Sequence, residues 1–195
     1  MPMIRETMLT TMSAEGRVHI APMGLIADGD SWIVAPFRPS TTLDNLRTVP
    51  FAVANYTDDV RIFAGCLTGR PEWPTTASDQ VPVPRLAGAL AHAELAVTDV
   101  TEDEQRTRFR FAVVGRGLHA PFEGFNRAKA AVIEASILVS RLHMLSREKI
   151  EAEMAYLEIA VANTAGAHEA EAWSWLMDAI RSYYAGGAAC PASRR

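Results

Sequence analysis

The sequence contains little of what several protein classes require. Cys66 and Cys190 are the only cysteines among 195 residues and belong to no CxxC pair, so a disulfide-stabilised secreted fold is not expected. Only two of the 19 basic residues are lysines and the formal net charge is -4, which disfavours a general nucleic-acid surface. No run of about 18 apolar residues occurs, so no membrane-spanning helix is expected. These absences, with no targeting segment visible, predict a cytoplasmic protein.

Familiar catalytic motifs are also missing. The five histidines show no HxH, HxxxH or HExxH spacing, so we expect no catalytic metal. No GxSxG, P-loop or GxGxxG motif is present, and the GRG stretch at residues 115–117 is too short to indicate a nucleotide-binding turn. No side chain stands out as a general acid or base. Catalytic residues therefore stay unassigned, and whether the chain is an enzyme stays open.

The composition is that of a globular protein, with 49% hydrophobic and 22% charged residues. In the first part of the chain, short apolar runs alternate with turn residues such as Gly16 and Gly29, which is typical of hairpins. Four prolines between residues 70 and 84 predict an ordered surface loop or lid. The segments expected to be β-strands are residues 5–11, 19–26, 31–35, 51–56, 62–67, 91–100 and 106–115.

From Asn126 onward the apolar residues recur with the helical period of about 3.6. We expect one helix from there to residue 143 or 145, a second over 147–162 with Ser146 as its N-cap, and a third over 167–185. Strands followed by helices predict an α+β protein whose antiparallel sheet is closed into a barrel or folded as a sandwich. The expected domains are a β domain, residues 1–125, and a helical domain, residues 126–195.

The stretch FRPSTTLDNL, residues 37–46, has two interpretations. Thr41 as an N-cap with Asp44 three residues later approximates a capping box for a short helix that Pro50 ends. The same stretch also gathers Arg38, several hydroxyl groups and the free N–H groups of a helix start, which is the equipment of a phosphate site. The residues alone leave both interpretations open.

Two further stretches offer groups for a ligand. In HIAPMGLIADGD, residues 19–30, Pro22 removes a ladder donor and Gly24 removes a side chain, which indicates an edge strand, a bulge, or backbone lying against a flat ligand. Asn55 ends an apolar strand and carries a carboxamide that both donates and accepts hydrogen bonds. Such a group suits the polar edge of a ring with imide and carbonyl groups.

The order of five stretches resembles a family of FMN-binding split-barrel proteins of the domain-of-unknown-function 447 type, found in methanogenic archaea, methylotrophs and other bacteria. The stretches are ETMLTT, HIAPMGL, APFRPSTTLDNL, AVANYTDDVRIF and FNRAKAAVIEASILVSRL. The resemblance extends from about residue 6 to 142 and continues more loosely into the terminal helices. It implies a six-stranded antiparallel Greek-key split β-barrel with a C-terminal helical appendage, and a homodimer with FMN at the subunit interface.

The resemblance also assigns ligand contacts to particular residues. Those expected to hold the FMN phosphate are Arg38, Ser40, Thr41 and Thr42, with Asn45 nearby. Those expected along the isoalloxazine are Pro22, Met23 and Gly24, with Asn55 at its polar edge. The implied function is an FMN-dependent oxidoreductase acting on a small molecule, with an association to pterin-dependent one-carbon metabolism. The alternative is a non-catalytic flavin carrier, or a structural dimer that binds another phosphate-bearing ligand.

Overall fold

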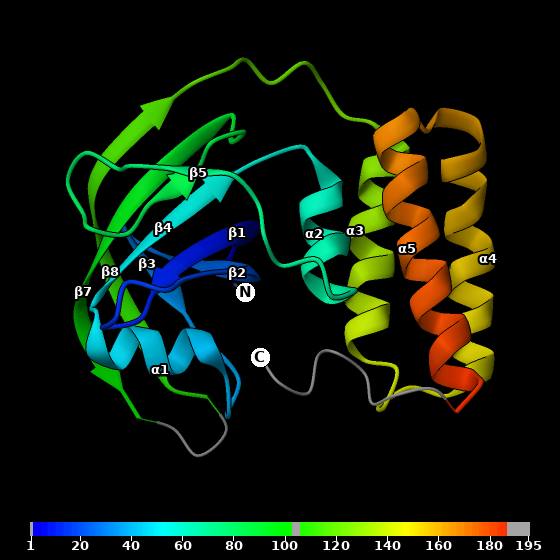
Figure 1. The fold of residues 1–195 in the computed structure, drawn as a ribbon, viewed down its shortest axis with the longest axis horizontal. Coiled ribbons are helices and arrows are strands. Elements are labelled where there is room, and N and C mark those ends of the chain that lie inside the picture. The colour runs from blue at the N-terminus through cyan, green and yellow to red at the C-terminus, as the bar shows by residue number, and fades with distance from the viewer. Residues whose placement is uncertain (1, 103–105, 187–195) are drawn as a thin grey trace. The chain divides into compact units, whose positions relative to one another are not determined.

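The computed structural model describes residues 2–102 and 106–186, which form two compact units. The barrel unit comprises residues 2–57 and 72–122, and the helical unit comprises residues 58–71 and 123–186. The strands in Figure 1 belong to the barrel unit, and the helices after residue 58 belong to the helical unit. The helical unit therefore takes a short segment from the first part of the chain as well as the C-terminal helices.

Six strands form a closed antiparallel barrel in the order β1-β2-β3-β8-β7-β4. The expected α+β class, with its antiparallel barrel and C-terminal helices, is confirmed. The barrel strands are β1 (Ile4–Met12), β2 (Val18–Asp28), β3 (Ser31–Val34), β4 (Phe51–Tyr56), β7 (Ala91–Thr101) and β8 (Arg108–Leu118).

The barrel core follows from the two-residue alternation of its strands. Leu9, Ala54 and Ala93 lie at directly paired or neighbouring positions of β1, β4 and β7 and are buried in one cluster. Helix α1 (Thr41–Thr48), which connects β3 to β4 at one end of the barrel, adds Leu43 and Leu46 to that cluster (Figure 1). Residues at the alternate strand positions lie on the opposite side of the sheet, which we call the outer face.

Strand β2 is paired unevenly along its two sides. It pairs with β1 from Val18 to Ile26 without a register shift, whereas its pairing with β3 covers only Ile26 to Asp28. Pro22 lies in the part of β2 that pairs with β1 but not with β3. The N–H group that proline lacks is therefore not missing from the β2–β3 ladder. The bulge is therefore wrong, and β2 is not an edge strand, because it lies between β1 and β3 in the closed barrel; only its stretch around Pro22 pairs on one side.

The proline-rich segment covers part of the outer face. It contains the small hairpin β5 (Thr75–Thr76) and β6 (Arg85–Leu86). Val81 and Val83 pack with Val53, whose neighbours along β4 point into the barrel core. Residues 75–86, which we call the covering segment, remove from solvent several polar side chains of β4 and β7 that would otherwise lie on the surface.

The helical unit contains α2 (Val60–Leu67), α3 (Arg127–Ser140), α4 (Arg147–Thr164) and α5 (Ala167–Tyr184), which share one apolar cluster. The strand expected over residues 62–67 is wrong, because this run is α2. Asp59 caps that helix by accepting a hydrogen bond from the Arg61 N–H, and Val60 and Ala64 pack into the cluster. A short, continuous apolar run does not distinguish a strand from a buried helix, which explains the difference.

The other helices lie close to their expected positions. Ser146 is the N-cap of α4, as expected, and its Oγ accepts from the Lys149 N–H. Helix α3 ends at Ser140, earlier than expected, and residues 141–144 form a turn. The end of the expected helical domain, residues 187–195, lies outside the described residues.

Candidate functional site

Ser40, not Thr41, caps helix α1. The Ser40 backbone is extended, and its Oγ accepts a hydrogen bond from the Leu43 N–H at 3.2 Å. Thr41 is therefore the first helical residue, and Asp44 lies one position beyond the place of a capping-box partner. The expected short helix is confirmed, while the expected N-cap is wrong by one residue.

A cluster of charged and hydroxyl groups lies beside this helix. Arg38 and Arg47 both form ion pairs with the Glu102 carboxylate. The Thr107 hydroxyl donates to Glu102 at 3.0 Å and accepts from Arg38 at 2.5 Å. The Thr107 hydroxyl, followed by Arg47 and Arg38, lowers the pKa of Glu102 below its usual value. We call these four residues the Glu102 cluster, which is a set of donors arranged around one anion.

The residues expected around a phosphate differ in their exposure. Arg38 and Thr41 are exposed, whereas Ser40 and Thr42 are buried. Asn45 is also buried, and its Nδ2 donates to the Thr11 Oγ1 at 3.0 Å. The exposed groups at this position are the Arg38 and Arg47 guanidinium groups and the Thr41 hydroxyl.

Sequence reasoning missed three members of the Glu102 cluster, namely Glu102 itself, Arg47 and Thr107. Arg47 lies on an exposed position of α1, and Thr107 comes from the region just before β8. The apolar positions Leu43 and Leu46 were a signal for Arg47, since they place it on the solvent side of a short helix. Nothing in the sequence indicated Thr107, because its contact with Arg38 spans 69 residues.

The three residues expected along a flat ligand do not point the same way. Met23 packs against the barrel core, and its carbonyl oxygen accepts from the Thr7 hydroxyl at 2.9 Å. Pro22 and Gly24 occupy alternate positions of β2 and therefore lie on the outer face. A Cβ on Gly24 would approach Ile4 Cγ2 to 2.9 Å, so packing within the β1–β2 pair is itself a reason for glycine here.

Asn55 is fully buried and its carboxamide binds within the protein. Its Nδ2 donates to the Met8 carbonyl at 2.9 Å and to the Thr10 hydroxyl at 2.7 Å. Its Oδ1 accepts from the Leu86 N–H at 2.7 Å. Asn55 thereby ties β1, β4 and the covering segment together, which is a structural role that the sequence did not indicate.

Strand β1 connects the groups that the sequence had singled out separately. Thr11 contacts Asn45, and Thr10 contacts Asn55. Across the sheet, successive Cα partners form one row over five strands: Pro22, Met8, Asn55, His92 and Gly117. At about 4.8 Å between strands, His92 lies roughly 14 Å from Pro22 along this row.

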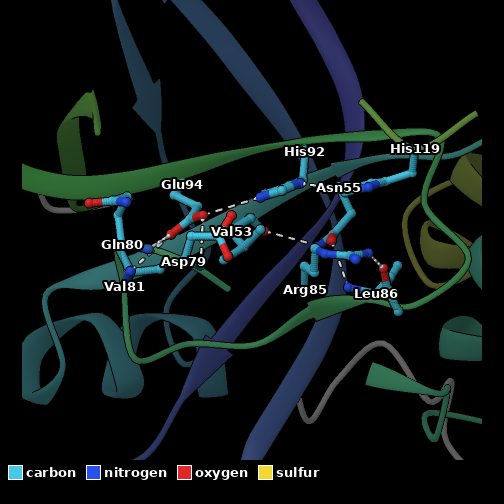
Figure 2. Close-up of polar contacts among 10 residues, drawn as sticks. All are labelled: Val53, Asn55, Asp79, Gln80, Val81, Arg85, Leu86, His92, Glu94 and His119. Atoms are coloured by element: carbon cyan, nitrogen blue, oxygen red, sulfur yellow. Dashed lines mark hydrogen bonds and ion pairs between the residues drawn. The ribbon is translucent and has the colours of Figure 1, made fainter. Parts of the chain in front are cut away.

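A second polar network begins at Glu94, which is 1% exposed beneath the covering segment. Its carboxylate accepts three backbone N–H bonds, from Asp79 at 3.0 Å, Gln80 at 2.6 Å and Val81 at 2.9 Å. Figure 2 shows these bonds converging on one side of the carboxylate, with His92 on the other. Glu94 therefore fastens the covering segment to β7.

Two histidines extend this network toward the surface. His92 Nε2 lies 3.2 Å from Glu94 Oε1, and His92 Nδ1 lies 2.8 Å from His119 Nε2 (Figure 2). The two rings stack with their centroids 5.0 Å apart. His92 is 3% exposed, whereas His119 is exposed. We call Glu94, His92 and His119 the Glu94 array.

The direction of the hydrogen bonds in the Glu94 array follows from the charge state of Glu94, its buried end. Burial acts to raise the pKa of Glu94, but the bonds from the three backbone N–H groups and from His92 outweigh it, and the pKa lies below its usual 4.5. The carboxylate is thus an acceptor only, and His92 Nε2 must carry the proton. A neutral His92 then accepts at Nδ1, so His119 donates from Nε2 and presents its Nδ1 lone pair.

The groups facing His119 favour its neutral form. Burial lowers the pKa of His119 below 6.5, and the positive charge of Arg85 lowers it further, while Asp79 acts in the opposite direction. His119 is therefore a base with a lone pair at neutral pH.

Two glycines make room for the Glu94 array. A Cβ on Gly117 would lie 2.4 Å from His92 Cε1, and one on Gly115 would lie 3.2 Å from the Glu94 carboxyl carbon. The GRG stretch, too short for a nucleotide-binding turn, thus has a packing role. The missed signal was the two-residue spacing of His92 and Glu94, facing Gly115 and Gly117 on the adjacent strand.

Other kinds of site find little support. Within residues 2–102 and 106–186, no group of three His, Cys, Asp or Glu side chains could hold a metal ion. None of the helices over the same residues combines the length and the apolarity that a bilayer crossing requires.

Comparison with protein families gives a match over most of the chain. Residues 5–120 match the N-terminal domain of the protein of unknown function DUF447, and residues 126–178 match the DUF447 C-terminal part. This chain belongs to the DUF447 family. The resemblance seen in the sequence is confirmed, and the barrel unit with its phosphate-site stretch falls within the N-terminal match.

Solved structures with similar folds extend beyond the DUF447 family. The crystal structure of an FMN-bound DUF447 protein from Methanosarcina mazei matches with a TM-score of 0.81 and 20% identity, covering 92% of this chain and 96% of that one. A 2-nitrobenzoate 2-nitroreductase from Pseudomonas fluorescens matches with a TM-score of 0.51 and 19% identity, over 61% and 66%. A flavoredoxin from Methanosarcina acetivorans matches with a TM-score of 0.50 and 12% identity, over 60% and 69%. No curated protein matches the sequence.

Proposed function

We propose that this DUF447 protein is an FMN-binding flavoprotein that acts as an oxidoreductase on a small molecule. Two lines of support are its family and the Methanosarcina mazei member of that family, which is an FMN-bound protein. The observation that carries the proposal for this chain is the Glu102 cluster, where two guanidinium groups and a threonine hydroxyl surround one anion.

The Glu102 cluster fits the phosphate of FMN by its chemistry. The Glu102 carboxylate is an anion with planar oxygen acceptors, and the cations that hold it suit phosphate equally well. We assign the phosphate contacts to Arg38, with Ser40, Thr41 and Thr42 at the start of α1, and we add Arg47. Because Glu102 occupies the same cations, a phosphate must compete with it for Arg38.

The isoalloxazine is proposed to lie along β2. Pro22 and Gly24 lie on the outer face in the part of β2 that pairs on one side only. Met23 and Asn45 support this region through the core and through Thr11. The proposed contact of Asn55 with the ring edge is indirect, since both of its polar groups already bind within the protein.

A homodimer with FMN at the interface is also part of this proposal. The one-sided pairing of β2 and the exposed side chains of Met3, Ile4 and Val18 offer a surface for a second copy. In such a dimer the bound flavin supplies hydride or electron transfer, and the protein binds and orients it. The link to pterin-dependent one-carbon metabolism stays a prediction from the resemblance.

The test is an FMN titration of the purified protein and of its variants, with flavin fluorescence as the signal. Arg38→Ala should weaken FMN binding about tenfold, because a charge-assisted hydrogen bond contributes about 1.5 kcal/mol or more. Thr41→Ala should weaken it less. Arg17→Ala is the control, since Arg17 is an exposed arginine of the same unit that pairs with Glu15.

Unchanged FMN affinity in the Arg38→Ala protein would contradict the assignment of the phosphate contacts. A parent protein that does not bind FMN would contradict the flavoprotein proposal itself. Stopped-flow mixing of the FMN-loaded protein with NADH and NADPH then separates two alternatives. Reduction and turnover with an acceptor indicate an oxidoreductase, whereas slow reduction and free exchange of FMN indicate a flavin carrier.

A further inference from the structure

The Glu94 array runs from the protein interior to its surface. Glu94 is 1% exposed, His92 is 3% exposed and His119 is exposed, so only one end meets solvent. The two hydrogen bonds within it, at 3.2 and 2.8 Å, are continuous (Figure 2). A linear chain of titratable groups with one exposed end has the geometry needed to move a proton.

Fastening the covering segment does not require the exposed end of this chain. The backbone N–H groups of residues 79–81 bind Glu94 directly, and Asn55 holds the Leu86 N–H. His119 takes no part in these bonds; it contacts His92 by a hydrogen bond and by stacking. A carboxylate alone would hold the segment, so the two imidazoles call for a further explanation.

We propose that the Glu94 array is a proton relay and that His119 Nδ1 is an acid–base site for a small weak acid. A proton taken up at His119 Nδ1 allows the Nε2 proton of His119 to pass to Nδ1 of His92. The positive charge then lies on His92 beside the Glu94 anion, and His119 is neutral again with its proton on Nδ1. The reverse transfers return the proton, and no other bond is made or broken.

The surroundings of His119 select the class of substrate. The charge of Arg85 lowers the pKa of His119, and the charge of Asp79 acts in the opposite direction. A weak acid that loses its proton to His119 becomes an anion, which the Arg85 guanidinium stabilises. The matching class is a small imide, enol or phenol. This inference does not depend on FMN binding and can hold if the flavin proposal fails.

The first test is the position of the imidazole protons in the full-length protein. Nitrogen-15 NMR of histidine-labelled protein at neutral pH should show His92 and His119 both protonated at Nε2. A His119 that carries its proton on Nδ1 at neutral pH would overturn the relay as described. This measurement uses the unmodified chain, so it does not depend on whether any variant folds.

The second test measures the basicity of His119 by its reaction with diethyl pyrocarbonate. The rate of carbethoxylation at His119, followed by mass spectrometry across pH, gives the midpoint of its titration. In Glu94→Gln this midpoint should fall by about one pH unit, because the anion that stabilises the relayed charge is lost. His143, an exposed histidine in the turn after α3, is the internal control and should not shift.

A midpoint for His119 that stays the same in the folded Glu94→Gln protein would contradict the relay and leave the array a packing feature. A purely structural role predicts lower stability in this variant with no change in the basicity of an exposed histidine 25 residues away in sequence. The two outcomes are therefore distinguishable.

The third test uses p-nitrophenol as the weak acid, because its anion absorbs at longer wavelength than its neutral form. Adding it should shift the His119 resonances and increase the fraction of anion above that in buffer. Arg85→Ala should reduce this effect at least fivefold, while Arg17→Ala should not. A nitrophenol that binds without moving the His119 resonances would overturn the substrate assignment.

Discussion

Two networks of the barrel unit have a glutamate at their centre, and they differ in what surrounds it. Glu94 is buried and accepts three backbone N–H groups and one imidazole. Glu102 is 57% exposed and binds two arginine side chains and a hydroxyl. Backbone donors are fixed by the fold, whereas arginine side chains can turn to another anion.

This difference in surroundings predicts different roles for the two networks. A buried carboxylate with fixed donors is costly to remove, because each donor would be left without water or a partner. An exposed carboxylate contributes little to stability, since water and salt replace its partners. The Glu94 array is therefore expected to matter for folding and proton transfer, and the Glu102 cluster for ligand exchange.

The largest effect is expected from removing the buried carboxylate. Glu94→Ala should lower the free energy of unfolding by about 3 kcal/mol or more, because it leaves several buried donors without an acceptor. Urea denaturation followed by circular dichroism measures this change. Glu102→Ala is the matched control, and its midpoint should stay close to that of the parent. Equal losses in both variants would erase the contrast between the two networks.

Asn55 supports the same cover from the neighbouring strand. Asn55→Ala should lower the free energy of unfolding by about 2 kcal/mol, because the buried Leu86 N–H loses its acceptor and a small cavity forms. Urea denaturation again provides the measurement. Asn163→Ala, at an exposed position of α4, should change stability little. A harmless Asn55→Ala would mean that the covering segment is held without this bond.

A smaller effect is expected where the array meets its glycines. Gly117→Ala places a Cβ 2.4 Å from the His92 ring and should cost about 1–2 kcal/mol through overpacking. It should also move the His92 NMR resonances. Gly88→Ala is the control, because its Cβ meets nothing within 4 Å. The comparison fails if both variants unfold at the same urea concentration.

The smallest effect is a pH dependence. The folded-state pKa of Glu94 lies below 4.5, so its stabilising contribution is full above that pH and is lost as the pH falls through the lower folded value. The free energy of unfolding, measured in urea at a series of pH values, should thus decrease below pH 4.5. The same series for Glu94→Gln should be flatter in that range. Identical slopes would show that other carboxyl groups dominate the acid response.

Much of the fold could be predicted from local patterns. Two-residue alternation located the six barrel strands, and the 3.6-residue period located the three C-terminal helices. The run at residues 62–67 misled because its apolar residues are continuous, and the deciding signal was the Asp59 cap before α2. The position of Arg38 before a short helix was also predictable, since both belong to one stretch of ten residues.

The sequence by itself determined the six barrel strands, the three C-terminal helices and the family, because these depend on residues close together in the chain. Only the tertiary structure decided which side chains meet. The Arg38–Glu102 pair spans 64 residues, and the His92–His119 contact spans 27. Both depend on which strands become neighbours in the barrel. The physical reason is that barrel closure sets these distances, while local periodicity sets only the face on which each side chain lies.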